Sequence, residues 1–413
     1  MTRSLEARLP LRRSAVPESV TEPVWRMTAN TFRQCGLKKG AIERYGRQLI
    51  LRDWGASAQE RVCQARVLVV GAGGLGCPVA VYLAGAGIGH IAIVDHDRVE
   101  RSNLHRQVLH HDANIGDLKA ESLRRACLAV NPDIDVQAIS VRFTSDNALE
   151  LVAGYDVIVD ATDNVESRYL INDVGVLSGI PVVSGSALGL EGQLTVYGFV
   201  YKRSTCYRCV FPEPPPKAAV GDCNNAGVLG PIPGVIGTLQ AVEVLKVVAN
   251  VGNVLSARLL VFDGLTMTTR VVRLRGRNPA CAVCGDEPTI TALAPSSSPT
   301  VCSPGRNPDI NHISVTDFGR MRGDGIVIDV RDAHQFAICS LNGSRNIPIA
   351  QLAGETLREL LDESRTIYCI CRRGVMSQVA AARLVNAGAT RVFSVGGGLT
   401  AYAKHVDPEF PIY

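Results

Sequence analysis

The sequence of 413 residues has no run of 18 apolar residues and no apolar segment of the signal-peptide kind near its start. We therefore expect no membrane-spanning helix and no secretion. The formal net charge is only +4, which is too small to indicate direct nucleic-acid binding. Arginines in residues 1–24 make a mitochondrial targeting segment an alternative, but interspersed glutamates dilute that pattern. We predict a disordered tail over residues 1–40.

The rest of the chain divides into two α/β units. Hydrophobic residues make up 46% of the sequence and charged residues 20%, so a large core can form. Residues 41–285 alternate strand-like and helix-like segments, which indicates a doubly wound α/β domain. Residues 286–311 are rich in Pro and Ser and are predicted to form a linker. Residues 312–413 alternate again, as expected for a second, smaller α/β domain.

The sequence contains 13 cysteines, an odd number that favours a reducing compartment in a chain without a secretory signal. Four of them form two CxxC pairs, "CYRC" (Cys206, Cys209) and "CAVC" (Cys281, Cys284). Each pair has the spacing of half a tetrahedral zinc site, so we predict a structural zinc site with four cysteine ligands. A disulfide or redox role is the alternative.

A glycine-rich motif predicts a nucleotide site in the large domain. The strand-like segment 66–70 precedes "GAGGLG" (71–76), and a helix-like run extends to about residue 86. This context suits GxGxxG, whose backbone N–H groups approach a phosphate. The strand-like segment 90–95 ends in Asp95, at the spacing of a ribose contact. The motif does not separate NAD from ATP.

The residues that follow favour ATP. "RSNLHRQ" (101–107) and Lys119 supply two cations beyond the acidic strand end, Arg106 and Lys119. A triphosphate needs such cations, because they neutralise the charge that develops when its α-phosphate is attacked. "YDVIVDATDN" (155–164) is a buried-strand pattern that ends in carboxylates. Oxygen ligands at the carboxyl end of a parallel strand suit Mg²⁺.

Five ordered motifs make the large domain similar to the MoeB/ThiF/ubiquitin-activating superfamily: "RYGRQ" (44–48), "GAGGLGCP", "SNLHRQ", "DATDN" and "EGQLTVY" (191–197). The resemblance implies adenylation of the C-terminal glycine of a ubiquitin-like protein. It implies that Asp163 holds Mg²⁺ and that Arg47 reaches into a neighbouring subunit of a homodimer. The resemblance also implies an ATP site formed by Gly74, Asp95, Ser102, Asn103, Leu104, His105, Arg106, Gln107, Lys119, Asp163 and Asn164.

Cys223 lies in "GDCNNAGVLGP", after the Pro-rich segment "FPEPPPK" (211–217). Gly, Asp and Asn indicate a flexible crossover, and spacing alone does not separate an acyl-accepting cysteine from an ordinary loop cysteine. The superfamily resemblance implies a functional cysteine here, which forms either a thioester or a mixed acyl disulfide.

In the small domain, Cys371 follows the strand-like "TIYCICR" (366–372) and precedes an amphipathic helix over 377–388. Loop N–H groups and the helix dipole favour an anion there, such as a thiolate. A cysteine-dependent phosphatase needs Arg after five intervening residues, but Ser377 occupies that position. A cysteine persulfide needs only the cradle, so sulfur transfer is favoured.

"DVRD", "NIP" (346–348), "CRRGVMS" and "VGGGLTAY" (395–402) make residues 312–413 similar to the rhodanese family. The resemblance implies that Cys371 carries the persulfide; a rhodanese fold kept only for docking is the alternative. Val375 and Met376 depart from the "GNDS" of close relatives, which leaves the sulfur donor open.

Together the domains resemble molybdopterin synthase sulfurylases. This implies a cytosolic protein that adenylates ubiquitin-like sulfur carriers ending in Gly-Gly, with ATP, Mg²⁺ and Zn²⁺. A desulfurase or another donor would load Cys371, and the thiocarboxylate product would serve molybdenum cofactor synthesis and tRNA wobble-uridine thiolation. The rival hypotheses are a ubiquitin-type activator with a thioester on Cys223, a nonenzymatic scaffold, and an NAD-dependent dehydrogenase.

Overall fold

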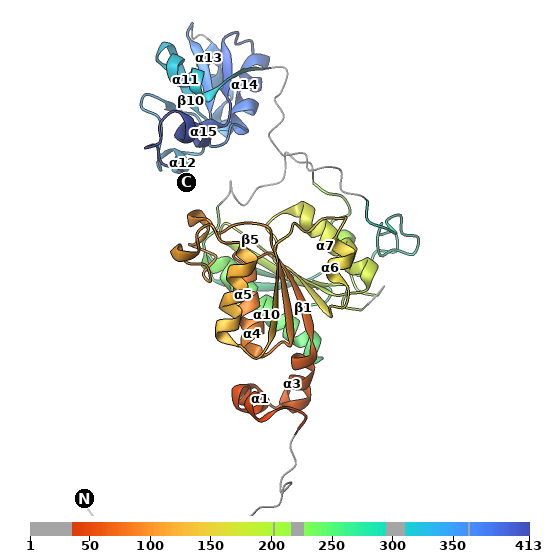
Figure 1. The fold of residues 1–413 in the computed structure, drawn as a ribbon. Coiled ribbons are helices and arrows are strands. Elements are labelled where there is room, and N and C mark those ends of the chain that lie inside the picture. Colours follow the sequence, from red (N-terminus) through yellow and green to blue (C-terminus); the bar gives the residue numbers. More distant parts are fainter. Residues whose placement is uncertain (1–34, 201–202, 216–226, 295–309, 362–363) are drawn as a thin grey trace, which may run out of the picture.

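The computed structural model describes residues 35–200, 203–215, 227–294, 310–361 and 364–413 (Figure 1). Cys223, most of the predicted tail and much of the predicted linker lie outside these residues. The predicted domain boundaries therefore stay predictions.

An eight-stranded sheet forms the centre of the large domain, in the order β3-β2-β1-β4-β5-β6-β7-β8. The first five strands in this order are parallel, and β6, β7 and β8 extend the sheet antiparallel. The strand order reverses between β1 and β4, the position at which open α/β sheets form their ligand crevice. The strands are β1 (Arg66–Val70), β2 (His90–Val94), β3 (Asp135–Ile139), β4 (Val157–Asp160), β5 (Val182–Leu188), β6 (Glu191–Tyr197), β7 (Arg258–Asp263) and β8 (Thr268–Arg273).

Helices cover both faces of this sheet, which confirms the predicted doubly wound fold (Figure 1). One apolar cluster joins side chains of α3, α4, α5 and α10 to the sheet, and a second joins α6 and α7 to the other face. The helices and 3-10 turns are α1 (Lys39–Arg44), α2 (Gly46–Leu49), α3 (Gly55–Gln64), α4 (Gly76–Ala86), η1 (Arg101–Asn103), η2 (Asp112–Asn114), α5 (Lys119–Val130), α6 (Ala148–Val152), α7 (Val165–Ser178), α8 (Tyr207–Val210) and α10 (Pro231–Ala249).

Among the described residues, α10 is the one helix whose length and apolar composition would suffice to cross a membrane. Half of it is buried inside the domain, where it contacts α4, β5 and β6. Its polar Gln240 is fully buried and donates to the main-chain oxygens of Asp160 and Val183 at 2.8 and 3.1 Å. These contacts explain the apolar sequence of α10 as that of a core helix.

The "RYGRQ" segment is held against the end of α4 by two of its side chains. Tyr45 is buried, and its hydroxyl accepts from Asn131 Nδ2 at 2.9 Å. The same Asn131 amide nitrogen also donates to the Ala84 carbonyl at 2.8 Å. Gln48 donates to the Ala86 carbonyl at 3.2 Å. Arg47, between the two anchors, is exposed.

The small domain contains a five-stranded parallel sheet in the order β11-β10-β12-β13-β9. Apolar clusters lie on both faces of this sheet, as its buried strands require. Its strands are β9 (Asn311–Ile313), β10 (Gly325–Asp329), β11 (Arg345–Asn346), β12 (Thr366–Ile370) and β13 (Val392–Val395). Its helices and 3-10 turns are α11 (Val315–Met321), η4 (Arg322–Asp324), α12 (Ala333–Phe336), η5 (Ile349–Gln351), α13 (Gly354–Leu361), α14 (Met376–Asn386) and α15 (Gly398–His405).

The Tyr45 anchor generates a stability prediction. Tyr45→Ala should lower the free energy of unfolding of the large domain by about 3–5 kcal/mol, because a buried aromatic ring is lost. Tyr45→Phe keeps the ring and loses one hydrogen bond, so we expect a loss of only about 1 kcal/mol. Denaturant unfolding of both variants measures the difference. Equal losses would show that the ring does not anchor the segment.

Candidate functional site

The glycine loop lies between β1 and α4, at the crevice of the large sheet. Gly71 has a φ of +104°, and a Cβ there would lie 2.6 Å from the Ala161 carbonyl. A Cβ on Gly76 would lie 1.9 Å from the Gly71 carbonyl. Glycine is therefore required at both positions for the turn to close. A Cβ on Gly73 would meet only Gln107, at 3.7 Å, so the middle of the loop leaves room for a ligand.

Asp95 follows β2 and ties down the glycine loop. Its Oδ2 accepts from the Ala72 N–H, and its Oδ1 accepts from the Asp97 N–H, both at 2.8 Å. Lys119 is buried, and its Nζ donates to Asp97 Oδ2 at 2.9 Å. Burial opposes ionisation of Asp97, but the hydrogen bond and charge of Lys119 outweigh it, so the pKa of Asp97 is lowered. The predicted acid and cation thus lie in one charged network.

The "SNLHRQ" segment forms a second wall of the site. Asn103 is buried, and its Oδ1 accepts from Arg106 Nη2 at 3.0 Å and from Gln107 Nε2 at 3.3 Å. Arg106 Nη1 also lies 2.9 Å from His105 Nε2 and donates to the Ser102 carbonyl at 3.1 Å. Leu104 and Arg106 are half-buried, whereas Ser102 and His105 are exposed.

Gln107 carries an unsatisfied acceptor in this wall. Its side chain is buried, and Oε1 has no hydrogen-bond partner among the residues that the structure describes. A buried polar atom without a partner is costly unless a ligand or water satisfies it. A Cβ on Gly74 would lie 3.4 Å from Arg106 Cγ, so the glycine loop and "SNLHRQ" adjoin. This arrangement fits a nucleotide bound between them.

The two acids of "DATDN" (160–164) have different roles. Asp160 is fully buried, and its oxygens accept from Thr162 Oγ1 at 2.7 Å, Ser184 Oγ at 2.8 Å and Arg168 Nε at 3.2 Å. These donors satisfy the hydrogen-bonding capacity of the Asp160 carboxylate, so its role is structural. Asn164 caps α7, with Oδ1 accepting from the Ser167 N–H at 2.8 Å. Asp163 is exposed between them, so it is the acid of "DATDN" that can offer oxygen to Mg²⁺.

Sequence reasoning missed His110, which is buried behind the glycine loop. Its Nε2 lies 3.0 Å from the Ala72 carbonyl, and its Nδ1 lies 2.9 Å from Ser122 Oγ. A carbonyl only accepts, so Nε2 must donate and Nδ1 accepts in the neutral ring. Burial lowers the pKa of His110, which favours this neutral form. No sequence motif identified this long-range contact.

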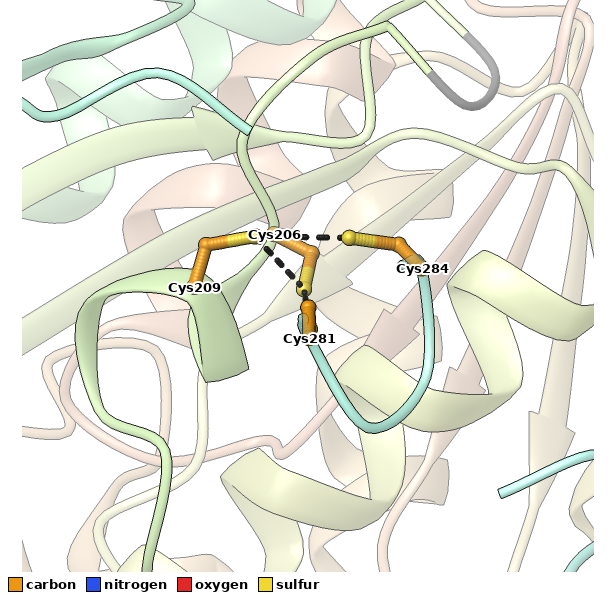
Figure 2. A group of neighbouring side chains, drawn as sticks. All are labelled: Cys206, Cys209, Cys281 and Cys284. Carbon is orange, nitrogen blue, oxygen red and sulfur yellow. Dashed lines mark hydrogen bonds between the residues drawn. The ribbon is translucent and has the colours of Figure 1, made fainter. Parts of the chain in front are cut away.

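The four cysteines of the two CxxC pairs lie together in the large domain, as Figure 2 shows. Their sulfur atoms all lie within 4.8 Å of one another, and all four residues are buried. The Sγ–Sγ distances are 3.7 Å for Cys206–Cys209, 3.6 Å for Cys206–Cys281 and 3.3 Å for Cys209–Cys284. Four sulfurs about 2.3 Å from a tetrahedral zinc ion would lie about 3.8 Å apart. The cluster therefore fits zinc.

Neighbouring groups hold this cluster in place. The Asn278 N–H donates to Cys209 Sγ at 3.3 Å. Arg208, in the same short helix as Cys209, forms a bidentate pair with Asp173 of α7 at 2.7 and 2.8 Å. Val176 of α7 packs against the cysteines. The four-cysteine cluster is thus joined to a helix that covers the central sheet.

Cys371 follows β12 directly and lies in a cradle of loop amides. Its Sγ lies 3.1 Å from the Gly374 nitrogen, 3.4 Å from the Ser377 nitrogen and 3.7 Å from Ser377 Oγ. Two N–H groups aimed at one sulfur stabilise a thiolate or persulfide anion. Ser377 Oγ is fixed in turn by Ser394 Oγ of β13 at 2.9 Å.

The "VGGGLTAY" segment forms the back of this cradle. The Leu399 N–H donates to the Cys371 carbonyl at 2.9 Å, and the Thr400 N–H and hydroxyl both donate to the Arg372 carbonyl at 2.9 Å. A Cβ on Gly398 would lie 2.1 Å from the Cys371 carbonyl, so the two motifs pack backbone against backbone. Cys369 is fully buried, and burial raises its pKa to about 12, as a core position requires.

The four-cysteine cluster generates one prediction. We expect about one zinc ion per chain in the purified protein. Cys281→Ser should remove it and lower the unfolding temperature of the large domain by roughly 5 °C or more. Elemental analysis and thermal unfolding measure both effects, with Cys63→Ser as a control that leaves the four thiols intact. Unchanged zinc content in Cys281→Ser would overturn the assignment.

His110 generates a pH prediction. Its folded pKa lies below its unfolded value, so the unfolded chain binds more protons as the pH falls below about 6.5. Its contribution to stability is present above that pH and is lost on acidification, no more steeply than about 1.4 kcal/mol per pH unit. His110→Asn should flatten the pH dependence of the unfolding free energy between pH 7 and 5. An unchanged slope in His110→Asn would contradict the assignment.

Comparisons with known proteins agree with this architecture. Residues 45–283 match the model of the ThiF family, and residues 314–405 match that of the rhodanese-like domain. The chain is 44% identical over 397 residues to the adenylyltransferase and sulfurtransferase MOCS3 of Aedes aegypti, covering 91% of this chain and 90% of that one. It is 43% identical over 420 residues to the Dictyostelium discoideum protein of the same name, covering 91% and 98%.

Among solved structures, Escherichia coli MccB with ATP superposes with a TM-score of 0.52 at 25% identity, over 58% of this chain and 74% of that one. MccB with succinimide gives a TM-score of 0.52 at 26% identity, over 59% and 74%. The glycine loop with its cations, the cysteine cradle and these similarities lead to one assignment. The chain belongs to the family of adenylyltransferases and sulfurtransferases in which a ThiF domain is followed by a rhodanese-like domain.

Proposed function

We propose that this enzyme adenylates the C-terminal glycine of a ubiquitin-like sulfur carrier and then converts that carboxylate into a thiocarboxylate. The observation that carries the proposal is the presence, in one chain, of a nucleotide crevice and of a cysteine sulfur that lies 3.1 Å from a loop amide nitrogen. The crevice can activate a carboxylate. The cradle can hold the sulfur that attacks it.

In the first reaction, a carboxylate oxygen of the carrier attacks the α-phosphorus of ATP, and pyrophosphate leaves. The chain contributes position and charge rather than a covalent intermediate. Arg106 and Lys119 neutralise phosphate charge, and the open middle of the glycine loop admits the phosphates. The amide of Gln107, whose Oε1 has no partner in the described part of the chain, supplies a polar contact for the nucleotide.

Magnesium would bind at Asp163, the exposed acid after β4. It would supply charge neutralisation at the phosphates. Asp95 orients the loop through Ala72 and is placed to contact the ribose, while Asn164 keeps α7 aligned through its cap. The remaining predicted nucleotide residues, Gly74, Ser102, Asn103, Leu104 and His105, form the wall described above.

In the second reaction, the outer sulfur of a Cys371 persulfide attacks the acyl carbon, and AMP leaves. The product is an acyl disulfide on Cys371. The Cys223 thiolate then attacks the Cys371 sulfur, so the carrier leaves as the thiocarboxylate and a Cys223–Cys371 disulfide remains. A thiol reductant restores both cysteines. Cys223 enters this proposal from the sequence alone, since it lies outside the described residues.

The same proposal covers the partners. A cysteine desulfurase or another sulfur donor would load Cys371. Arg47, which is exposed between the anchoring side chains of Tyr45 and Gln48, would complete the nucleotide site of a second subunit. Zinc would occupy the four-cysteine cluster. Cytosolic thiocarboxylate would then supply molybdenum cofactor synthesis and tRNA wobble-uridine thiolation. The names and two-domain architecture of the relatives support the adenylyltransferase and sulfurtransferase steps.

A ubiquitin-type activator that ends in a thioester on Cys223, with a rhodanese domain used only for docking, is the second candidate. The cradle argues against it, because a docking domain has no need of two amides aimed at a buried sulfur. The dehydrogenase hypothesis is set aside by family membership.

The decisive measurement is the intact mass of a Gly-Gly-ending carrier after incubation with the enzyme, ATP, Mg²⁺, a reductant and a sulfur source. We expect the mass change of one oxygen replaced by sulfur. Cys371→Ala should abolish it, since no persulfide can form. Cys369→Ala is the matched control: it removes a neighbouring thiol of β12 that burial keeps protonated, so thiocarboxylate formation should persist.

Two outcomes would reject the proposal. One is a carrier that stays unmodified although pyrophosphate exchange shows that adenylation proceeds. The other is a carrier that becomes linked to Cys223 equally well in the Cys371→Ala enzyme, which would favour the ubiquitin-type activator.

A further inference from the structure

The last residues of the sequence fold back beside the cradle. After α15, Phe410 packs edge-on against Tyr402 with ring centroids 5.7 Å apart. The Cys339 thiol lies 3.7 Å from the Pro411 carbonyl. These contacts hold residues 406–413 against the small domain and fix the position of Tyr413.

Tyr413 is joined to a buried ion pair at the end of β10. Arg331 is buried, and its Nε donates to the two carboxylate oxygens of Asp329 at 2.9 and 3.0 Å. Its Nη2 also donates to Asp329 and to the Cys339 carbonyl, the latter at 2.7 Å. Nη1 donates to the Gln335 carbonyl at 3.1 Å and to the Tyr413 hydroxyl at 2.6 Å. The phenol is therefore held by a guanidinium that cannot turn away without losing other bonds.

The face of the Tyr413 ring meets Arg372, the residue that follows Cys371. The Arg372 guanidinium lies 4.7 Å from the ring centroid, within the range of a cation–π contact. The main chain of Arg372 is fixed separately, because Thr400 donates twice to its carbonyl. Both the backbone and the side chain of the first loop residue are thus held by α15 and the segment after it.

A guanidinium held in this way bears on the chemistry of the sulfur. Ordering an arginine side chain costs rotamer entropy, so a fixed cation beside an anion site needs a partner that orders it. Arg372 follows Cys371 directly in the cradle loop, and its guanidinium is ordered by the Tyr413 ring. Charges are screened over about 8 Å at physiological ionic strength, so a cation ordered on this loop can act on an anion at the neighbouring residue.

We propose that Tyr413 is a positioning residue for the sulfur chemistry, which holds the Arg372 guanidinium beside the cradle so that the sulfur on Cys371 is stabilised as an anion. This inference rests on the proposed function, because it assumes that Cys371 reacts as a thiolate or persulfide. It adds a role for a segment that the adenylation and transfer steps do not use.

Charged and titratable groups lie on several elements beside the cradle, among them the Tyr413 phenol. β12 contributes Cys369, the loop contributes Arg372 and Arg373, and β10 leads into the Asp329–Arg331 pair, whose charges balance each other. On α14, Ser377 contacts the sulfur of Cys371. Its hydrogen-bond partner on β13 is another serine, Ser394. Within the loop of residues 371–376, the charged side chains are those of Arg372 and Arg373.

The test is the rate at which iodoacetamide alkylates Cys371 in the full-length protein, followed by peptide mass spectrometry from pH 5 to 9. This readout needs neither ATP nor a carrier, so it can fail independently of the proposed function. Tyr413→Leu should raise the pH midpoint of labelling by about half a unit, that is, about threefold slower labelling below the midpoint. Tyr413→Phe keeps the ring and should lie between Tyr413→Leu and the wild type.

Ile412→Ala is the matched control, because this neighbouring side chain is 58% exposed; its midpoint should not move. Arg372→Met should raise the midpoint by at least as much as Tyr413→Leu, and adding Tyr413→Leu to it should change nothing further. A purely structural role for Tyr413 would lower the unfolding temperature and leave the pH midpoint unchanged. That result, or an unshifted midpoint in Arg372→Met, would overturn the inference.

Discussion

The nucleotide crevice and the Cys371 cradle both depend on backbone N–H groups that form no hydrogen bonds within a helix or a strand. A parallel strand that ends at a turn into a helix leaves such donors at one edge of the sheet. In the large domain the glycine turn after β1 aims them at the crevice, and Asp95 fixes the loop by accepting from Ala72. In the small domain the turn after β12 aims them at Cys371. One domain can thus present donors to a phosphate and the other to a sulfur anion, with the same strand–turn–helix geometry.

Each domain also buries an Asp–Arg pair at the end of a central strand. Asp160 ends β4 and is held by Arg168, whereas Asp329 ends β10 and is held by Arg331. Each carboxylate has further donors, Thr162 and Ser184 in one case and the Arg331 N–H in the other. Buried charges are tolerated only with such complete pairing. These ion pairs hold the turns that follow the two strands, and this restricts the positions of the functional side chains nearby.

The parts of the molecule that the sequence predicted are those encoded by local patterns. "GAGGLG" lies in one turn, each CxxC pair lies in one turn, and the Cys371 cradle is one loop between a strand and a helix. The doubly wound sheet and the four-cysteine cluster were predicted correctly for this reason. The antiparallel extension β6–β8 was not predicted, because strand direction depends on how connections fold in space.

The residues that sequence reasoning missed act across long separations. His110 supports the Ala72 carbonyl from 38 positions away, and Tyr413 meets Arg331 from 82 positions away. The sequence pattern "DATDN" also could not show that the Asp160 carboxylate is buried and hydrogen-bonded within the domain, whereas Asp163 is exposed.

The four-cysteine cluster has a topological consequence. Its two halves belong to segments 75 positions apart, and the chain between them includes α10, β7, β8 and the crossover segment that contains Cys223. A metal on these thiolates would close that stretch into a ring with fixed ends, which lowers the entropy of the unfolded chain as a covalent cross-link does. Unlike a disulfide, such a closure does not require an oxidising compartment.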